Sequence, residues 1–311
     1  MISRKPMNKK IVAAQPAIYQ TGCNFKIFPF RAWENCGGKG VKTIYPVKYA
    51  RWFIQHYDIV PSFWHSSKTA RLCFVQPLSL YYDTYSSTTF YEIIPLIWDC
   101  WPCYDDKLCK WIVRHHVKAC IFTSSEAAKR ISERLEYLKI LVITEGITLD
   151  EYPPGKKLSE RNNDVFVFGR WPGYVSKTDL SSLNVVRNGT DEEFRQRLQD
   201  SKITINVPRC DVVPEQTGSQ ETLTQRYWEC MLSRMVMVGR APKELTDLIG
   251  YNPVIDIDRE NLGLQLKSIV EDIDHYQQLV DRNRETALRM GSWDIRMKQV
   301  MEWLQSLGYS I

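Results

Sequence analysis

The feature that most constrains the fold is a repeated alternation of short apolar segments with segments of helical period. Segments of strand length are expected at residues 10–19, 41–46, 57–63, 71–77, 91–99, 118–125, 139–147, 164–170, 202–209, 235–239 and 252–258. Helical segments are expected at residues 30–40, 105–117, 125–138, 191–201, 221–233 and 241–250, and from residue 261 onward. Such alternation is typical of an α/β fold, in which helices cover both faces of a parallel sheet.

A polar stretch with Pro and Gly, residues 148–163, divides this alternation into two halves. We therefore expect two Rossmann-like domains with doubly wound parallel sheets, residues 1–150 and residues 151–290. A C-terminal helical segment, residues 291–311, is expected to pack back on the N-terminal domain. Ligands of such folds bind beyond the carboxyl ends of the strands, so we expect the site in the cleft between the domains.

Composition narrows the classes of function. The net charge of +5 is modest and evenly spread, which argues against a nucleic-acid partner and fits an anionic small molecule or an acidic membrane surface. No run approaches the roughly 18 apolar residues of a membrane span, and no signal peptide is recognisable. Nine cysteines without an export signal predict free thiols in a reducing cytoplasm.

Two glutamates, Glu221 and Glu229, stand eight positions apart in a segment expected to be one helix. Eight residues span about 12 Å of helix axis and bring the second carboxylate back to nearly the same side. If Glu221 begins the helix, the free N–H groups of residues 221–224 would form a site suited to a diphosphate. Glu221 would then meet sugar hydroxyls and Glu229 a ribose diol. The alternative is that both are solvated carboxylates on an amphipathic helix.

This arrangement resembles the retaining glycosyltransferases of the two-Rossmann (GT-B) type, the group 1 or family-4 class. Their signature is two glutamates with seven residues between them, then a small-residue turn and an apolar strand, here "ECMLSRMVMV". The flanks agree in order. "VITEGITLDEYPPG" resembles the interdomain stretch, "FVFGR" the strand that opens the donor domain, "SKITINVPR" the strand before the glutamates, and "SWDIRMKQVMEWL" the closing helix. "TGCNFKIFPFRAW" is similar to the N-terminal glycine turn and helix.

The chain departs from the family pattern in three places, which indicates a divergent member. The usual Phe-Gly after the first glutamate is Thr222-Leu223 here. The usual glycine after the second glutamate is Arg234. The basic pair that clamps the donor diphosphate is normally close together, whereas Arg170 and Lys177 are seven positions apart.

The resemblance implies an enzyme that moves a sugar from a nucleotide-diphosphate sugar to a hydroxyl of a glycan, lipid-linked or small-molecule acceptor, as in polysaccharide biosynthesis. It implies retention of configuration, no metal ion and no cofactor, with basic side chains stabilising the leaving group. Residues 1–150 would serve the acceptor and residues 151–290 the donor. A cytoplasmic enzyme with peripheral contact to the inner face of a membrane is expected.

The site residues that the resemblance implies fall into three groups. Glu221 and Asp99 would be catalytic. The donor would be bound by Glu229, Arg170, Lys177, Gly169, Thr217, Gly218 and Ser219, with Arg226 and Arg209 as rival phosphate contacts. The acceptor side would include Gly22, Cys23 and Asn24.

Alternatives stay open at this point. Asp99 could instead be a helix N-cap. Cys100 and Cys103 form a Cys-x-x-Cys pair close to Cys109, so zinc or redox chemistry is an alternative to free core thiols. The same fold could also serve a non-catalytic nucleotide-sugar- or glycan-binding module, or an enzyme such as a sugar-phosphate epimerase or a phosphorylase.

Overall fold

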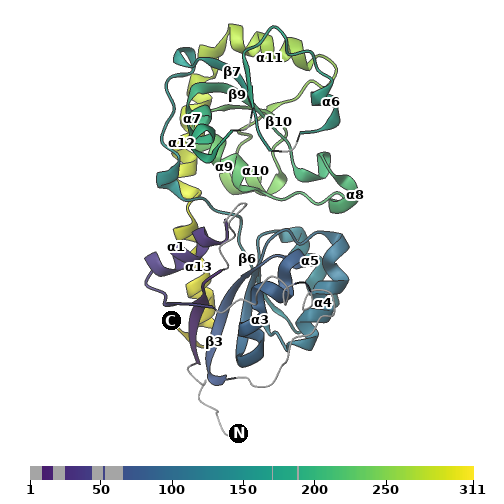
Figure 1. The fold of residues 1–311 in the computed structure, drawn as a ribbon, viewed down its shortest axis with the longest axis vertical. Coiled ribbons are helices and arrows are strands. Elements are labelled where there is room, and N and C mark those ends of the chain that lie inside the picture. The colour runs from purple at the N-terminus through teal and green to yellow at the C-terminus, as the bar shows by residue number, and fades with distance from the viewer. Residues whose placement is uncertain (1–8, 17–24, 44–51, 53–65, 170, 188) are drawn as a thin grey trace. The chain divides into compact units, whose positions relative to one another are not determined.

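The computed structural model describes residues 9–16, 25–43, 52, 66–169, 171–187 and 189–311 (Figure 1). The chain divides into two compact units. Unit 1 holds Met1–Thr144 and Trp293–Ile311, and unit 2 holds Glu145–Ser292. Each unit has its own sheet and its own hydrophobic core, so the architecture of each is described separately.

The sheet of unit 1 has seven strands, all paired in parallel. They are β1 (Lys9–Ala14), β2 (Gly40–Val41), β3 (Ser66–Val75), β4 (Tyr91–Ile97), β5 (Ala119–Phe122), β6 (Lys139–Val142) and β12 (Tyr309–Ser310). The order is β12-β1-β3-β4-β5-β6, and β2 also pairs with β1. β4 is buried from residue 93 to residue 97, as expected for a strand that is covered on both faces.

Helices cover both faces of this sheet. They are α1 (Ile27–Asn35), α3 (Leu80–Phe90), α4 (Asp105–Arg114), α5 (Ser125–Arg134) and α13 (Trp293–Ser306). Because side chains of a strand alternate between faces, Leu72 and Phe74 of β3 pack in the core with α1 and α13. Cys73 and Val75 pack in the core with α3, α4 and α5.

The sheet of unit 2 has five parallel strands in the order β11-β10-β9-β7-β8. They are β7 (Asn163–Val167), β8 (Val185–Arg187), β9 (Ser201–Asn206), β10 (Val236–Gly239) and β11 (Ile255–Asp256). The helices are α6 (Gly173–Ser176), α7 (Asp191–Asp200), α8 (Pro214–Thr217), α9 (Gln225–Leu232), α10 (Lys243–Ile249), α11 (Leu262–Glu271) and α12 (Gln277–Met290). Val165 and Phe166 of β7 belong to the cores on opposite faces.

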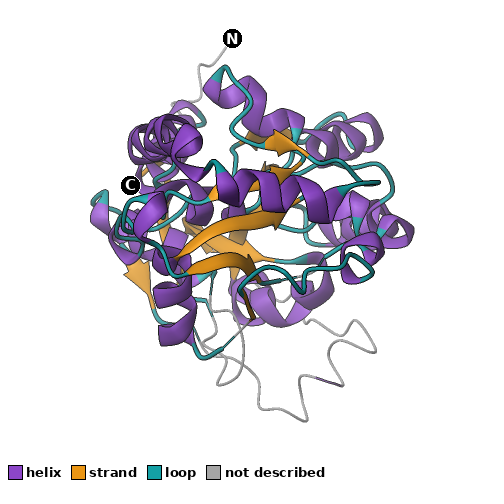
Figure 2. Ribbon diagram, turned by 90° about the horizontal axis from the view of Figure 1, so that it is seen from above, coloured by secondary structure: helices purple, strands orange, loops and turns teal. Residues whose placement is uncertain are grey.

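The predicted fold class is confirmed: both units have Rossmann-like parallel sheets that helices cover on two faces. Figure 2 shows the strands as layers between helices. Within the described part of the chain, no helix is long and apolar enough to cross a membrane. Two predicted strands cannot be compared in full. Residues 44–46 of the strand predicted at 41–46, and all of the strand predicted at 57–63, lie outside the described residues.

Helix α3 was missed by the sequence reading. Its residues are rich in Tyr, Ser and Thr, which weakly favour a helix. The hydroxyl of Thr84 donates to the carbonyl of Leu80 at 2.7 Å, and the hydroxyl of Thr88 donates to the carbonyl of Thr84 at 3.0 Å. These bonds satisfy the two hydroxyls, which can therefore be buried without cost from unpaired polar groups. Burial against the sheet then outweighs the weak helix propensity of the segment.

The predicted helix over residues 221–233 was wrong at its start. Helix α9 begins at Gln225, and Thr224 before it has extended backbone angles (φ −99°, ψ 158°). Glu221 therefore lies in the preceding loop, and the two glutamates do not share a helix. After α9, Arg234 has φ 56°, a left-handed conformation that favours glycine. Arg234 thus has a glycine-favouring backbone conformation at the position where the resemblance leads one to expect glycine.

Candidate functional site

The carboxyl ends of the parallel strands of unit 2 meet at one edge of its sheet, where open α/β sheets bind ligands. β9 ends at Asn206 and β10 ends at Gly239. A Cβ atom on Gly239 (φ 152°) would lie 1.8 Å from the carbonyl oxygen of Asn206, so glycine allows this close approach. The N–H group of Arg240 donates to the same carbonyl at 2.9 Å. The end of β10 thus fixes the position from which the Arg240 side chain extends.

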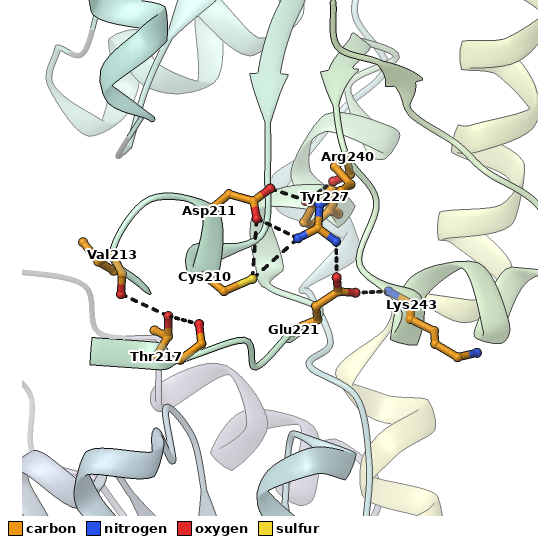
Figure 3. A network of polar contacts seen from close by, with 9 residues as sticks. Cys210, Asp211, Val213, Thr217, Glu221, Tyr227, Arg240 and Lys243 are labelled. Atoms are coloured by element: carbon orange, nitrogen blue, oxygen red, sulfur yellow. Dashed lines mark hydrogen bonds and ion pairs between the residues drawn. The ribbon is translucent and has the colours of Figure 1, made fainter. Parts of the chain in front are cut away.

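Arg240 joins two acidic side chains at this edge (Figure 3). Its Nε and Nη2 donate to Oδ2 and Oδ1 of Asp211 at 3.0 and 2.7 Å, which makes a bidentate pair. Its Nη1 donates to Oε1 of Glu221, and Oε2 of Glu221 accepts the backbone N–H of Lys243 at 2.8 Å. The Tyr227 hydroxyl donates to the Arg240 carbonyl at 2.7 Å. Segments that follow β9 and β10 are thereby joined to the loop before α9.

We call Arg240, Asp211 and Glu221 the Arg240 cluster. The hydrogen bonds that Arg240 donates to Asp211 and Glu221 raise the pKa of Arg240, so its guanidinium stays charged. One cation between two carboxylates leaves the cluster with negative charge. Its side chains are partly exposed, at 36% for Arg240, 16% for Asp211 and 22% for Glu221. The cluster is therefore open to a ligand that offers hydroxyl donors.

Glu229, on α9, lies in different surroundings. The Tyr152 hydroxyl donates to its Oε1 at 3.0 Å. Burial raises the pKa of Glu229, against the opposing effects of the Tyr152 hydrogen bond and the nearby charge of Arg226. Burial and the adjacent carboxylate also raise the pKa of Tyr152, so the phenol keeps its proton and acts as the donor. Among the described residues, Glu229 is thus a carboxylate held by the Tyr152 phenol rather than by an ion pair.

Gly169, Arg226 and Glu229 are brought together by the end of β7. The guanidinium of Arg226 lies over the ring of Phe168, 5.2 Å from its centre. Gly169 has φ 69°, and a Cβ atom there would lie 1.6 Å from Nη2 of Arg226. A side chain at position 169 would therefore displace Arg226, which contributes positive charge beside Glu229.

Backbone N–H groups around the start of α9 donate to carboxylates of the chain itself. The N–H of Leu223 donates to Oε2 of Glu244 at 3.0 Å, and the N–H of Gln225 donates to Oε2 of Glu145 at 3.1 Å. The positive end of the helix is thus complemented by Glu145. The predicted diphosphate site on the N–H groups of residues 221–224 is wrong at Leu223, because that donor already has an internal partner.

The segment between β9 and α9 carries several of the remaining donor-side residues. Thr217 is buried, and its hydroxyl donates to the carbonyl of Val213 at 3.0 Å. Gly218 has φ 58° and ψ −138°, a conformation that is essentially restricted to glycine. Ser219 is exposed. Arg209 donates to Oε1 of Gln216 at 2.9 Å, which ties the turn after β9 to α8.

Other predicted residues lie elsewhere or beyond the description. Lys177 directly follows α6 and is exposed, and it is not part of the Arg240 cluster as described. Arg170 lies outside the described residues, as do Gly22, Cys23 and Asn24, predicted for the acceptor side.

Asp99 lies after β4, at the carboxyl edge of the sheet of unit 1. Its φ of 49° is unusual for a residue other than glycine. Gln76, which follows β3, donates from Nε2 to Oδ2 of Asp99 at 2.7 Å. The N-cap positions of the next helical segments are Trp101 and Tyr104, so the alternative that Asp99 caps a helix is wrong.

A buried ion pair lies at this same edge of unit 1. Lys26, just before α1, donates to Oδ2 of Asp83 in α3 and to the Ser79 hydroxyl, 3.3 Å away. Asp83 also accepts the backbone N–H of Gln76 at 3.3 Å. The pair therefore connects helices on the two faces of the sheet and, through Gln76, contacts Asp99.

The cysteines of unit 1 that the structure describes are free thiols. Burial raises the pKa of Cys100, Cys109 and Cys120, which keeps them protonated and poorly reactive. Cys103 is exposed. Among the residues that the structure describes, no group of three or more His, Cys, Asp or Glu side chains could hold a metal ion.

Sequence reasoning missed five side chains of these networks. Arg240 directly follows β10 and Asp211 lies in the short turn after β9, and a polar residue just beyond the end of a strand is a usable signal in a parallel sheet. Tyr152, Lys26 and Asp83 lack such a signal, because their partners are distant in the sequence: Glu229 for Tyr152, and each other for Lys26 and Asp83.

Comparisons with solved structures agree with this architecture. The chain is similar to Anabaena HepE in complex with UDP and glucose, at 11% identity over 96% of this chain and 100% of that one, with a TM-score of 0.63. It is similar to sucrose-phosphate synthase from Thermosynechococcus elongatus, at 11% identity over 96% and 99%, with a TM-score of 0.58. A glycosyltransferase from Rickettsia africae matches at 11% identity over 96% and 99%, with a TM-score of 0.53.

These likenesses extend over nearly the whole chain and establish that its fold is that of GT-B glycosyltransferases. No protein-family model matches the sequence, and no curated protein sequence matches it.

Proposed function

We propose that this protein is a glycosyltransferase that moves a sugar from a nucleotide-diphosphate sugar to a hydroxyl acceptor. The observation that carries the proposal is the partly exposed Arg240 cluster at the carboxyl edge of the sheet of unit 2. Arg226 and Glu229 lie on α9, the helix between Glu221 and Arg240 in the chain. The similar Anabaena structures contain UDP, glucose or UDP-glucose, which supports the same class of donor here.

On this proposal the donor lies along unit 2. Glu221 accepts hydrogen bonds from hydroxyls of the transferred sugar, and Glu229 accepts hydrogen bonds from the ribose. Positive charge from Arg226 and Arg209, together with Arg170 and Lys177, stabilises the diphosphate as it leaves. A carboxylate beside a diphosphate would repel it, so the two glutamates meet the uncharged parts of the donor.

The chemistry needs few groups. The bond between the anomeric carbon and the diphosphate oxygen breaks, and a bond from the acceptor oxygen forms on the same face of the sugar. The hydroxyl proton is released to solvent. Positive charge develops on the anomeric carbon, and the fixed negative charge of Glu221 stabilises it. Basic side chains supply the charge that a metal ion would otherwise provide.

The acceptor is assigned to unit 1, where Asp99 would orient a hydroxyl of a glycan or a lipid-linked acceptor. Its left-handed backbone conformation supports a functional reading, because such conformations concentrate at functional sites. Gln76 holds one of its carboxylate oxygens.

The test is turnover by Glu221→Gln, which keeps the size of the side chain and removes its charge. We expect about a 100-fold loss of turnover, roughly 2.7 kcal/mol, with nucleoside diphosphate affinity nearly unchanged. Release of nucleoside diphosphate from a panel of UDP-, GDP- and ADP-sugars measures the first quantity, and calorimetry measures the second. Glu271→Gln, at an exposed carboxylate near Lys267, is the control and should behave as wild type.

A non-catalytic nucleotide-sugar-binding module is the second candidate. The specific observation in its favour is that both oxygens of Glu221 accept hydrogen bonds from groups of the chain itself. Binding of nucleotide sugars without any release of nucleoside diphosphate, in the presence of glycan acceptors, would select this candidate over the transferase.

A further inference from the structure

We propose that Tyr152 is a positioning residue that aims Glu229 at the ribose diol and so makes the protein discriminate against deoxynucleotides. This inference rests on the proposed function, because it needs a nucleoside diphosphate bound to unit 2. It concerns a side chain that does not itself touch the nucleotide.

Tyr152 is fixed at both ends. The residue is 9% exposed and packs in the core that contains Phe166 and Phe168. Its carbonyl accepts a hydrogen bond at 3.2 Å from Arg284, which also donates to the carbonyl of Leu232 at the end of α9. The phenol is therefore held at a set position relative to the helix that carries Glu229.

The phenol occupies one side of the Glu229 carboxylate. It donates to Oε1, and among the described residues no second hydrogen-bond donor to Glu229 is found. A carboxylate offers about four acceptor positions, whereas a ribose diol offers two O–H donors. The Tyr152 bond thus leaves capacity for a diol while it fixes the direction in which the carboxylate points.

Unit 1 contains a second tyrosine–glutamate pair, in which the carboxylate is fully paired by groups of its own unit. Tyr309 donates to Oε1 of Glu92, and Lys9 forms an ion pair with Oε2 of the same carboxylate. Burial tends to raise the pKa of Glu92, but the hydrogen bonds from Lys9 and Tyr309 outweigh it and lower the pKa. Glu92 is thus neutralised inside its own unit.

Glu229 differs from Glu92 in this respect. Arg226, whose charge acts on Glu229, lies over the ring of Phe168, and the pKa of Glu229 is raised rather than lowered. A partly buried carboxylate without a bonded cation is costly unless further donors reach it. A ligand with two hydroxyls supplies such donors.

The experiment compares ribose and deoxyribose nucleotides. Calorimetry with UDP, GDP and ADP first identifies the nucleotide that binds. The affinities of its 2′-deoxy and 3′-deoxy analogues are then measured in the same way. The wild type should bind the ribose form about tenfold or more tightly than at least one analogue, the usual scale for a hydrogen bond to a charged group. Tyr152→Phe should lose most of that preference, mainly by binding the ribose form about tenfold more weakly.

Tyr309→Phe is the matched control, since it removes the same hydroxyl from the same kind of pair in unit 1, and it should keep the wild-type preference. The readout is a ratio of affinities from one sample, so a modest loss of stability does not change it. The positioning role would be overturned if Tyr152→Phe kept the wild-type ratio of affinities for the ribose and deoxyribose forms. It would also be overturned if the variant bound the selected nucleotide and both of its deoxy analogues more weakly by the same factor. Wild-type protein that binds none of the three ribonucleotides would instead overturn the proposed function, and the inference with it.

Discussion

The carboxyl edges of the two sheets are built around different ion pairs. In unit 2, Arg240 lies between Asp211 and Glu221, and the three side chains are partly exposed. In unit 1, Lys26 meets Asp83 with side-chain exposures of only 6% and 3%. The Arg240 cluster thus has a net negative charge and is open to solvent, whereas the Lys26–Asp83 pair is balanced and buried.

The difference separates a binding surface from its support. A buried pair repays its desolvation only when both charges are present, so the Lys26–Asp83 pair behaves as one structural unit. Gln76 connects this buried pair to Asp99, because its backbone N–H donates to Asp83 and its side chain donates to Asp99. The Arg240 cluster is partly exposed, so a ligand can reach it.

The largest expected effect tests the support in unit 1. Lys26→Met should lower the free energy of unfolding by about 3–5 kcal/mol, because Asp83 is left buried without its cation. Urea unfolding followed by fluorescence measures this loss. The matched control is Lys243→Met, which breaks an exposed pair with Asp247 and should cost less than about 1 kcal/mol. Similar small losses in both variants would contradict the distinction between the two edges.

A smaller effect, on turnover rather than stability, is expected in unit 2. Arg240→Lys keeps the charge but cannot bond Asp211 in a bidentate manner and reach Glu221 at the same time. Sugar transfer, measured by release of nucleoside diphosphate, should fall about tenfold, roughly 1.4 kcal/mol. Arg130→Lys is the control, since Arg130 forms the same bidentate pair with Asp105 in unit 1 at 2.8 and 3.2 Å. Equal turnover in both variants would remove Arg240 from the site.

The smallest expected effect concerns Glu229, which has no bonded cation in the described part of the chain, whereas Asp83 is paired with Lys26. The pKa of Glu229 is raised in the folded protein, so its ionised form opposes folding above that pKa. The stability present at low pH is lost as the pH rises through the folded pKa. Glu229→Gln should therefore melt slightly higher than wild type at pH 7, and the difference should shrink toward pH 4. A lower melting temperature at pH 7 would show that the charge is compensated.

The order of most helices and strands could be predicted from the sequence, because the spacing of apolar residues and the presence of helix-capping residues are local properties. Ser124 caps α5, where its hydroxyl accepts the N–H of Ala127 at 3.4 Å. Helix α3 could not be predicted, since its propensity is weak and its stability comes from burial against β3 and β4. The start of α9 was placed too early because Thr222 and Thr224 fit a helical period as well as an extended segment.

The candidate site could be predicted only in part. The two glutamates followed from their spacing and the family resemblance, and each has proved to lie in unit 2 with a distinct partner. The partners themselves, Tyr152 and Arg240, are 77 and 19 positions away. No local pattern specifies such contacts, because they depend on how the strands are ordered in the sheet.

The return of the chain to unit 1 has a consequence for the order of folding. β12 pairs with β1, and α13 supplies Trp293 and Met297 to the same core as α1. Unit 2 is one continuous stretch, Glu145–Ser292, whereas unit 1 needs residues from both sides of it. During synthesis, all residues of unit 2 are therefore made before those of unit 1 are complete. The face of β3 that carries Leu72 and Phe74 cannot be covered by α13 until that last helix has been made. The unit whose synthesis begins first is the one that completes its core last.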